Sequence, residues 1–320
     1  MTVTVGVDLG GTKIQSAGLV DAAVSPGERI LTPHTGVDDV VAGIVTVVHA
    51  AADKAGIALG RLAGVCVGSP GHIDADHGIV SHSPNVPGFA EPVDLGPRLS
   101  AALGGVAVTL DNDVRVAMLG EHRMGAGRPY RNVMGVFVGT GVGGGLVLDG
   151  TLRTGRGSAG EIGHTMVDPH GRMCSDGRRG HLEAYAGRGR IEAHARQLVE
   201  HGHHTKLFKI MKKKGKPRLT SSVIAKAMAE HDHMANRLVD DAVWALGIAL
   251  ASAQNLLDLE AIVIGGGLGD RLGQPFVEAI VAEMTPRLLV PDQPPTVITT
   301  ELGDLSGAVG AALLAADTFA

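Results

Sequence analysis

The sequence VFVGTGVGGGLVLDG at residues 136–150 decides the fold. It opens with Val136, Phe137 and Val138, a short apolar run of the kind that forms a buried strand. Five glycines and the hydroxyl of Thr140 follow within residues 139–145. Glycine lets backbone N–H groups approach an anion closely and adopts positive φ without strain. A buried strand that runs into such a loop predicts a phosphate-binding turn.

Acidic and metal-binding side chains follow in residues 151–183. Glu161 and Glu183 are carboxylates, and His164 stands close behind Glu161 in the chain. Three further side chains of types that bind metals recur at short spacing, namely Cys174, Asp176 and His181. A phosphate turn, two acids suited to polyol hydroxyls and a candidate metal cluster together indicate a phosphotransferase for a small polar molecule.

The bulk composition is that of a globular protein long enough for two domains. Of the 320 residues, 44% are hydrophobic and 19% are charged. The formal net charge of −5 argues against a dedicated nucleic-acid binder, which usually carries a basic excess. The one basic cluster, residues 206–218, is interpreted as a solvated loop.

Two cysteines, Cys66 and Cys174, stand far apart in the sequence, which excludes a disulfide framework and favours a reducing compartment. The N-terminus lacks the basic and apolar regions of a secretion signal. No uninterrupted apolar run approaches the roughly 20 residues that a membrane helix needs. These features predict a cytoplasmic protein without a membrane span.

The N-terminus contains a second candidate phosphate turn. Residues 3–7 and 13–20 read as strands, joined by Asp8-Leu-Gly10-Gly11-Thr12-Lys13. In the functional interpretation, Gly10 to Thr12 bind the β- and γ-phosphates of a nucleotide and Asp8 holds Mg²⁺ through water. The alternative is an ordinary hairpin with a partly exposed aspartate. The chain has no P-loop, and no helix follows the turn as a dinucleotide fingerprint requires.

The next segments place polar residues after buried strands, where ligand sites of α/β proteins form. We expect a helix at residues 37–55 and a strand at residues 62–67, in which Cys66 packs. The loops at residues 68–74 and 83–89 follow, and each is a ligand loop or a bare turn. After a strand at residues 106–110 comes Asp111-Asn-Asp113, followed by a helix at residues 114–124. Asp113 either caps that helix or accepts a proton from a hydroxyl.

The chain then restarts, because residues 133–138, the glycine loop and a strand at residues 146–148 repeat the pattern of the first hairpin. Residues 201–220 read as a polar loop. Helices are predicted at residues 188–200, 236–257, 276–284 and 306–316, and strands at residues 261–264 and 297–299. Gly265, Gly266 and Gly267 follow a buried strand directly, which suits the edge of a nucleotide site.

Six motifs in this order resemble the ROK family (repressors, open reading frames and kinases), in particular its glucokinase-like sugar kinases. They are Asp8 to Lys13, Asp111 to Asp113, Gly139 to Gly145, Gly160 to His164, Gly180 to Glu183 and Ile264 to Gly267. The resemblance implies the actin-like fold of sugar kinases, Hsp70 and actin, with two α/β domains around a cleft. The smaller domain would comprise residues 1–112 with 305–320, and the larger one residues 113–304.

The resemblance also implies roles for individual residues. Asp113 would be the general base that takes the proton of the sugar 6-hydroxyl, and Asn112 would bind a neighbouring hydroxyl. Further sugar contacts would come from Gly71, His72, Asn85, Glu161, His164 and Glu183. The ATP phosphates would lie on residues 10–13 and 139–145, including Thr140 and Gly141, and the adenosine on Gly265 to Gly267. ATP with Mg²⁺ is implied.

One motif departs from the family pattern. Many members bind structural zinc with one histidine and three cysteines in a C-x-C-G-x-x-G-C frame. Here the frame reads Cys174-Ser-Asp176-Gly-Arg-Arg-Gly-His181. Because aspartate and histidine also bind Zn²⁺, His164, Cys174, Asp176 and His181 remain a four-ligand set. The alternative is a metal-free loop held by hydrogen bonds.

The leading hypothesis is an ATP-dependent glucokinase, acting as a homodimer. Alternatives within the family are a kinase for N-acetylmannosamine, fructose or mannose, or a glucokinase that uses polyphosphate. A sugar-responsive repressor is disfavoured because Asp113 is present and Asp8 comes too early for a preceding DNA-binding domain. A nicotinamide-dependent oxidoreductase is disfavoured because the loop at residues 139–145 runs into a strand rather than a helix.

Overall fold

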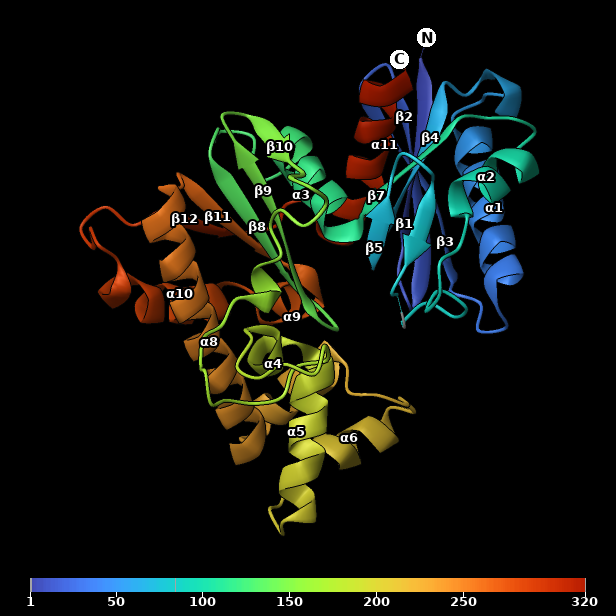
Figure 1. The fold of residues 1–320 in the computed structure, drawn as a ribbon. Helices are drawn as coiled ribbons and strands as arrows, with labels where there is room; N and C mark the ends of the chain where they lie inside the picture. Colours follow the sequence, from blue (N-terminus) through green and yellow to red (C-terminus); the bar gives the residue numbers. More distant parts are fainter. Residues whose placement is uncertain (1, 84, 320) are drawn as a thin grey trace. The chain divides into compact units, whose positions relative to one another are not determined.

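The computed structural model describes residues 2–83 and 85–319 and divides into two compact units. Unit 1 comprises residues 1–129, 145–159 and 301–320, and unit 2 comprises residues 130–144 and 160–300. Each unit combines a sheet with helices (Figure 1). Pro84 of the predicted ligand loop lies outside the described residues, as do residues 1 and 320 of the predicted smaller domain.

The sheet of unit 1 has the strand order β3-β2-β1-β4-β7. Its strands are β1 (Val3–Leu9), β2 (Lys13–Val20), β3 (Ala23–Leu31), β4 (Gly64–Ser69) and β7 (Val108–Asn112). Strands β1, β4 and β7 are parallel, whereas β2 and β3 run antiparallel. The parallel strands therefore end at one edge of the sheet, where Asp8, Gly68 and Asn112 stand. A separate hairpin pairs β5 (His72–Asp74) with β6 (Ile79–Ser81).

Helices cover both faces of this sheet because β1 alternates between them. Val3, Val5 and Val7 form one core with α1 (Val37–Lys54) and α2 (Leu95–Ala102). On the other face, Thr4 donates from its hydroxyl to the carbonyl oxygen of Ala312 at 2.8 Å. That face carries α3 (Asp113–Met124) and α11 (Ser306–Phe319).

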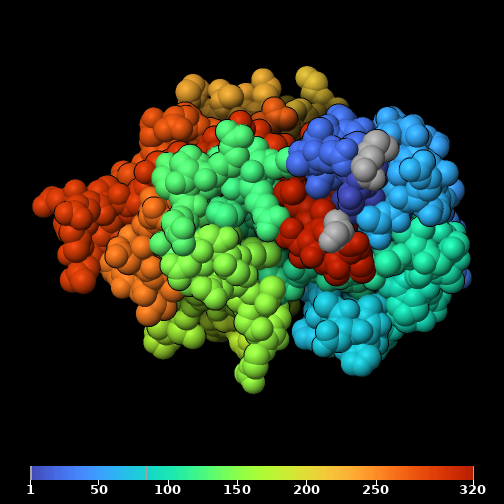
Figure 2. Space-filling view, turned by 90° about the horizontal axis from the view of Figure 1, so that it is seen from above, coloured from blue at the N-terminus to red at the C-terminus, as the bar shows by residue number. Residues whose placement is uncertain are grey.

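Helix α11 lies very close to the sheet and to α3 because the contact positions are glycines. A Cβ at Gly6 would lie 2.0 Å from the carbonyl oxygen of Ala308, and one at Gly310 would lie 1.6 Å from that of Val116. No larger side chain fits at either position. Figure 2 shows the C-terminal segment packed beside the N-terminal strands, as the contacts of α11 with β1 require.

The second sheet has the order β10-β9-β8-β11-β12. Its strands are β8 (Val133–Val138), β9 (Val142–Leu148), β10 (Thr151–Arg153), β11 (Ala261–Gly265) and β12 (Thr296–Thr299). Strands β8, β11 and β12 are parallel, and β9 and β10 are antiparallel additions. The unit boundary passes through β9, because a Cβ at Gly145 would meet Met118 of unit 1 at 2.5 Å.

Unit 2 is rich in helices, of which the longest is α8 (His233–Leu257). The others are α4 (Glu183–Ala186), α5 (Arg188–Glu200), α6 (Leu207–Lys213), α7 (Ser221–Ala229), α9 (Gly266–Leu272) and α10 (Gln274–Met284). Short 3₁₀ turns occur in both units: Leu59–Arg61, Ile162–His164, Thr285–Arg287 and Gly303–Leu305. Among the described residues, no helix has the length and apolar character of a transmembrane segment.

Several sequence-based element predictions were wrong. The strand expected at residues 146–148 begins at Val142, so Gly143, Gly144 and Gly145 lie in β9 and not in a loop. The segment predicted as a polar loop, residues 201–220, contains α6. The helix expected at residues 114–124 is confirmed and begins one residue earlier, at Asp113. Strand β3 and helix α2 were not predicted at all.

The boundaries of the two compact units lie at different residues from the boundaries of the two predicted domains. Helix α3 belongs to unit 1, whereas the predicted boundary lies between residues 112 and 113. The division into residues 1–112 with 305–320 and residues 113–304 stays a prediction.

Candidate active site

Asp8 lies at the carboxyl end of β1, against the first turn of α11. A Cβ at Gly307 would lie only 2.9 Å from the Cγ atom of Asp8, so glycine is required there. Burial raises the pKa of Asp8 to about 6, and the positive charge of Lys13, whose Nζ lies 4.0 Å from Oδ2, partly opposes this. Asp8 is thus a shielded carboxylate beside a helix N-terminus and a lysine.

The turn between β1 and β2 is held by its own backbone. The Gly10 N–H donates to the carbonyl oxygen of Lys13 at 2.9 Å. The hydroxyl of Thr32 donates to the carbonyl oxygen of Gly10 at 2.6 Å. A Cβ at Gly11 would lie 2.3 Å from the carbonyl oxygen of Asn85. The structure therefore brings one predicted phosphate turn against one predicted sugar loop.

The other predicted sugar residues of this loop region are near the surface of unit 1. His72 and Asn85 are exposed. Gly71 has a φ of 102°, and a Cβ there would lie 2.5 Å from the carbonyl oxygen of Ser81. Phe89 is fully buried in the core of unit 1.

Asn112 and Asp113 occupy the junction between β7 and α3. Asn112 is the N-cap, because its Oδ1 accepts from the backbone N–H groups of Val114 at 3.0 Å and Arg115 at 3.1 Å. Its amide NH₂ keeps its donors for other partners. The capping role considered for Asp113 therefore belongs to Asn112. Asp113 is the first residue of the helix and is half-buried.

Asp111 is held in a structural ion pair instead. Its Oδ1 accepts from Nε of Arg115 at 2.7 Å and also from Nη2, and both side chains are less than 10% exposed. Arg115 additionally donates to the carbonyl oxygen of Gly157 at 2.5 Å. A Cβ at Gly68 would lie 3.3 Å from the Cα of Asp113, so this glycine lets the start of α3 approach β4.

In unit 2, the turn between β8 and β9 is Gly139-Thr140-Gly141, the predicted phosphate turn. The backbone N–H of Gly139 donates to the carbonyl oxygen of Gly141 at 2.9 Å. Oε2 of Glu183 accepts from the Val142 N–H at 3.0 Å, and a Cβ at Gly141 would lie 2.2 Å from that oxygen. Oε1 of Glu183 accepts from the hydroxyl of Ser175. Glu183 thus joins the predicted phosphate turn to the metal-binding segment.

The glycines that follow this turn serve packing. A Cβ at Gly144 would lie 2.4 Å from the carbonyl oxygen of Gly160. The expectation that residues 143–145 lie in a loop was wrong because they belong to β9, while their contact with nucleotide phosphates stays a prediction.

Glu161 and His164 flank the 3₁₀ turn Ile162–His164. Glu161 is exposed, and its side chain makes no hydrogen bond to another described residue. The His164 side chain is 41% exposed and lies beside the metal-binding segment.

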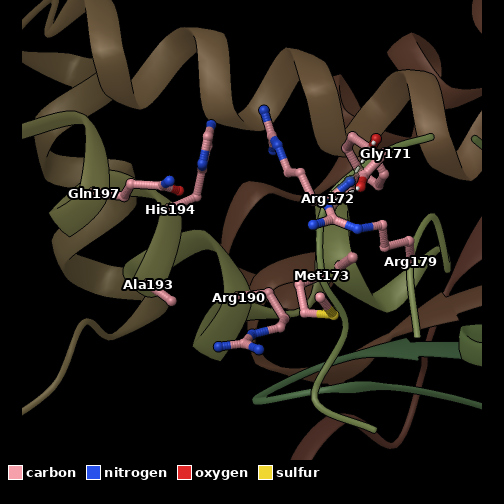
Figure 3. Close-up of a pocket in the computed structure, with 10 residues that line it drawn as sticks. Gly171, Arg172, Met173, Arg179, Arg190, Ala193, His194 and Gln197 are labelled. Carbon is pink, nitrogen blue, oxygen red and sulfur yellow. Dashed lines mark hydrogen bonds between the residues drawn. The ribbon is translucent and has the colours of Figure 1, made fainter. Parts of the chain in front are cut away.

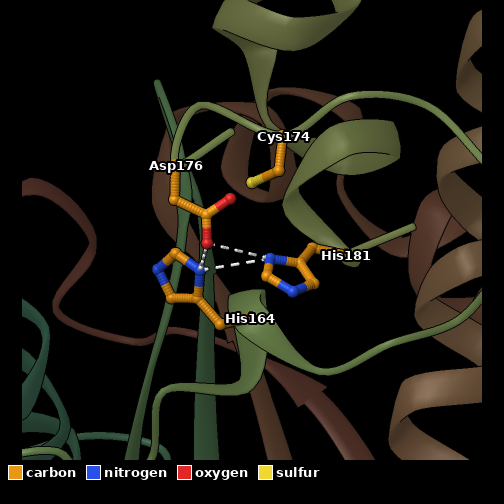
Figure 4. Close-up of side chains that lie close together, drawn as sticks. All are labelled: His164, Cys174, Asp176 and His181. Carbon is orange, nitrogen blue, oxygen red and sulfur yellow. Dashed lines mark hydrogen bonds and ion pairs between the residues drawn. The ribbon is translucent and has the colours of Figure 1, made fainter. Parts of the chain in front are cut away.

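The four predicted metal ligands converge (Figure 4). The ligand atoms of His164, Cys174, Asp176 and His181 all lie within 4.8 Å of one another. Oδ2 of Asp176 lies 3.2 Å from Nδ1 of both histidines. A zinc ion bound at about 2.0–2.3 Å from each ligand needs such crowding, and one thiolate, one carboxylate and two imidazoles form an acceptable zinc set. The donor set fits the ion.

The groups around His164 raise its pKa. A hydrogen bond to Cys174 raises the pKa of His164 to about 9, against the opposing effect of burial. The negative charges of Glu183, Cys174 and Glu161 act in the same direction as the hydrogen bond. These groups favour the protonated form of His164, with which a metal ion would compete.

The glycine triplet predicted to hold adenosine lies beside the end of β8, which leads into the predicted phosphate turn of unit 2. Gly266 has a φ of 79°, and a Cβ there would lie 2.7 Å from the Val138 nitrogen at the end of β8. A Cβ at Gly267 would lie 3.3 Å from Oγ of Ser221 and 3.6 Å from Nη1 of Arg188.

Arg188 is a residue that the sequence analysis missed. It donates from Nη2 to the hydroxyl of Thr140 at 2.8 Å and from Nη1 to that of Ser221 at 3.4 Å. Burial lowers its pKa, and the nearby Arg218 adds to this effect. A guanidinium shared between two neutral hydroxyls retains the capacity to bind an anion. Its signal in the sequence was an arginine five residues after Glu183, outside the six motifs.

The comparisons with known proteins agree on one family. The ROK family model matches residues 4–318. The chain is 34% identical over 316 residues to a glucokinase of Thermotoga maritima, covering 96% of this chain and 95% of that one. It is 32% identical over 280 residues to an N-acetylmannosamine kinase of Haemophilus influenzae, covering 85% of this chain and 83% of that one.

A solved structure extends the likeness to three dimensions. A ROK family glucokinase of Streptomyces griseus, in complex with glucose and AMPPNP, matches with a TM-score of 0.81 and 29% identity. The alignment covers 98% of this chain and 99% of that one. The fold is thus the actin-like ATPase fold of sugar kinases, with two α/β units. The chain belongs to the ROK family.

Proposed function

We propose that the protein transfers the γ-phosphate of ATP to the 6-hydroxyl of a hexose, with glucose as the first candidate. The observation that carries the proposal is the position of Asp113. It opens α3 at the carboxyl ends of the parallel strands of a mixed sheet, while Asn112 provides the cap and Asp111 takes the structural ion pair. The glucokinase relatives support the same reaction.

Asp113 is the proposed general base. As the sugar O6 forms its bond to the γ-phosphorus, the bond between that phosphorus and the oxygen of the ADP leaving group breaks. The hydroxyl proton passes to the Asp113 carboxylate. A positioned base contributes about 10²–10⁴-fold, while charge stabilisation and alignment supply most of the rest.

The sugar hydroxyls are assigned to carboxylates and imidazoles, which accept or donate several hydrogen bonds at once. In unit 2, the candidates are Glu161, His164 and Glu183, and the exposed Glu161 has both oxygens available. In unit 1, the amide NH₂ of Asn112 stays available while its oxygen caps α3. Gly71, His72 and Asn85 complete the proposed set.

The nucleotide phosphates are assigned to Gly10, Gly11, Thr12 and Lys13 in unit 1 and to Thr140 and Gly141 in unit 2. Arg188 joins them because it already contacts the hydroxyl of Thr140. Gly265, Gly266 and Gly267 are proposed to face the adenosine. Asp8 would hold Mg²⁺, which neutralises phosphate charge when bound. Its shielded carboxylate beside Lys13 fits this role.

We also propose that the cluster of His164, Cys174, Asp176 and His181 holds a structural zinc ion. The ion would fix the orientation of His164 and of the turn that carries Glu161. Elemental analysis of the purified protein should find about one zinc per chain, and Cys174→Ser should lose it. Well under half an equivalent of zinc in protein purified without chelators would refute this assignment.

A second candidate within the family is an N-acetylmannosamine kinase, which the Haemophilus influenzae relative favours. Fructose and mannose as acceptors, and polyphosphate as donor, are the remaining alternatives. Kinases with these substrates would differ from a glucokinase in the acceptor or the donor, and they would share the proposed general base and the fold.

Coupled ADP release with MgATP separates these activities. The panel comprises glucose, mannose, fructose, N-acetylglucosamine and N-acetylmannosamine, and a parallel assay of sugar phosphate uses polyphosphate as donor. We expect the highest kcat/KM with glucose and ATP. Activity confined to another sugar would identify that sugar as the substrate instead of glucose. No activity with any sugar of the panel, in protein shown to be folded, would contradict the kinase assignment.

A further inference from the structure

A cavity of about 510 Å³ opens in unit 2, apart from the residues assigned to sugar and nucleotide. This size lies within the range of small-molecule sites, about 300–1,000 Å³. One wall is the segment around Arg172, Met173 and Arg179, and another is helix α5 with Arg190 and His194 (Figure 3). The floor includes Tyr185 of α4.

The lining of this cavity is cationic. It contains three arginines and a histidine but no aspartate or glutamate. Among the described residues, only Arg172 of these arginines has an ion-pair partner, Asp241 of α8. Arg179 donates to the carbonyl oxygen of Gly171 at 3.2 Å, and the side chain of Arg190 has no hydrogen bond or ion pair to a described residue.

Arg172 has an unused donor in this wall. Its Nη1 atom is buried and lacks a hydrogen-bond partner among the described residues, although its side chain is 18% exposed overall. An unsatisfied buried donor on a charged group is costly, so such atoms are rare unless a ligand or water completes them. The guanidinium also lies over the ring of Tyr185, 4.8 Å from its centroid, which fixes its orientation.

The neighbouring histidine responds to the same positive charge. Burial lowers the pKa of His194, and the charge of Arg172 lowers it further. Asp241, the ion-pair partner of Arg172, acts on His194 in the opposite direction, so the cationic groups of the lining without a described acidic partner are Arg179 and Arg190. Guanidinium groups suit phosphate because their planar donors bind its oxygens in pairs.

We propose that this cavity binds a phosphate-bearing anion through Arg172, Arg179 and Arg190. The binding is independent of the kinase assignment, because none of these residues belongs to the proposed active site. Inorganic phosphate, a sugar phosphate and a polyphosphate chain share the chemistry that these arginines recognise.

Isothermal titration at constant ionic strength tests the proposal with inorganic phosphate, glucose 6-phosphate and tripolyphosphate as separate probes. The wild-type chain is compared with the double variant Arg179→Gln/Arg190→Gln. Lys212→Gln/Lys213→Gln is the matched control, since it removes the same charge from exposed positions of α6 in unit 2. A third variant, Arg172→Lys, keeps a cation beside Asp241 but removes the planar donor pair.

We expect at least one of the three anions to bind the wild type. The anion with the lowest Kd identifies the kind of phosphate compound that the cavity takes. The double variant should weaken that binding by about tenfold or more. Arg172→Lys should weaken it in the same direction, while the control should stay within about twofold. Anion binding at the active site remains in every variant and cancels in the comparison. Equal affinity of the wild type and the double variant, or no binding by any probe, overturns the proposal.

Discussion

At the scale of single residues, two aspartates near the end of β7 have different surroundings. Asp111 is buried against Arg115, whereas Asp113 is half-buried at the first position of α3. The sequence motif shows both acids but not which of them is held in an ion pair. That distinction depends on the fold, because Arg115 reaches Asp111 only through the first turn of the helix and also contacts Gly157.

Arg188 carries the prediction that belongs to this scale. Replacing it with glutamine removes a guanidinium that lies between Thr140 and Ser221. Loss of a charge-assisted hydrogen bond should raise the KM for ATP by about 10- to 100-fold, with little change in the KM for the sugar. Steady-state kinetics with each substrate varied in turn measures both constants.

The matched control for this variant is Lys212→Gln, which removes one exposed cation from unit 2. Its KM for ATP should equal that of the wild type. A rise in the sugar KM alone, or no rise in either constant for Arg188→Gln, would exclude Arg188 from the phosphate site.

At the scale of elements, some bounds were predicted from the sequence, whereas several short or exposed elements were missed. Strands β2 and β8 and helix α5 have the predicted bounds, because their residue patterns change abruptly at both ends. Strand β3 was missed because it is mostly exposed and contains Pro26 and Gly27, which weaken a strand pattern and are tolerated at a sheet edge. Helix α6 was missed because it is short and lysine-rich and buries only Leu207 and Ile210.

Helix α5 also carries a buried acid that ties it to the start of α7. Glu192 is 5% exposed and accepts from Arg196, from Nε of Arg218 at 2.9 Å and from the Leu219 N–H at 2.9 Å. Burial opposes its ionisation, but these hydrogen bonds outweigh burial and lower the pKa of Glu192 below its ordinary 4.5. Its folded pKa therefore lies below its unfolded one.

The sign of the pH dependence follows from this shift. The stabilisation by ionised Glu192 is fully present above the pKa that Glu192 has in the unfolded chain. It is lost as the pH falls through the lowered pKa of Glu192 in the folded protein. Glu192→Gln should cost about 1–3 kcal/mol in free energy of unfolding at pH 7. The difference from the wild type should shrink on acidification, as measured by urea unfolding at a series of pH values. A constant difference from pH 7 to pH 3 would show that the charge of Glu192 does not stabilise the fold.

At the scale of the whole molecule, the chain passes between its two units at several points. The buried acid Glu121 of unit 1 forms hydrogen bonds with backbone close to two of these points. Glu121 is fully buried and accepts from the backbone N–H of Ala126, near where the chain leaves unit 1. It also accepts from those of Glu301 and Leu302, where the chain re-enters, and from the Ser306 hydroxyl. Contacts between such distant segments cannot be predicted from local sequence patterns.

Glu121→Gln tests this arrangement. The amide NH₂ of glutamine would face N–H donors that now point to a carboxylate oxygen, so the free energy of unfolding should fall by about 1–3 kcal/mol. Chemical unfolding should detect the loss, whereas Glu91→Gln, at an exposed position of unit 1, should leave the stability unchanged. Equal stability of both variants would mean that Glu121 does not secure these segments.

Turnover by Asp113→Asn tests the central claim most directly, since the substitution preserves shape and removes only the proton acceptor. ADP release with glucose and MgATP should fall by about 10²–10⁴-fold, while calorimetry shows glucose binding close to that of the wild type. Asp53→Asn, an exposed position on α1, should retain full turnover. Near-normal turnover by Asp113→Asn would contradict the account, because the reaction would then proceed without the base on which it rests.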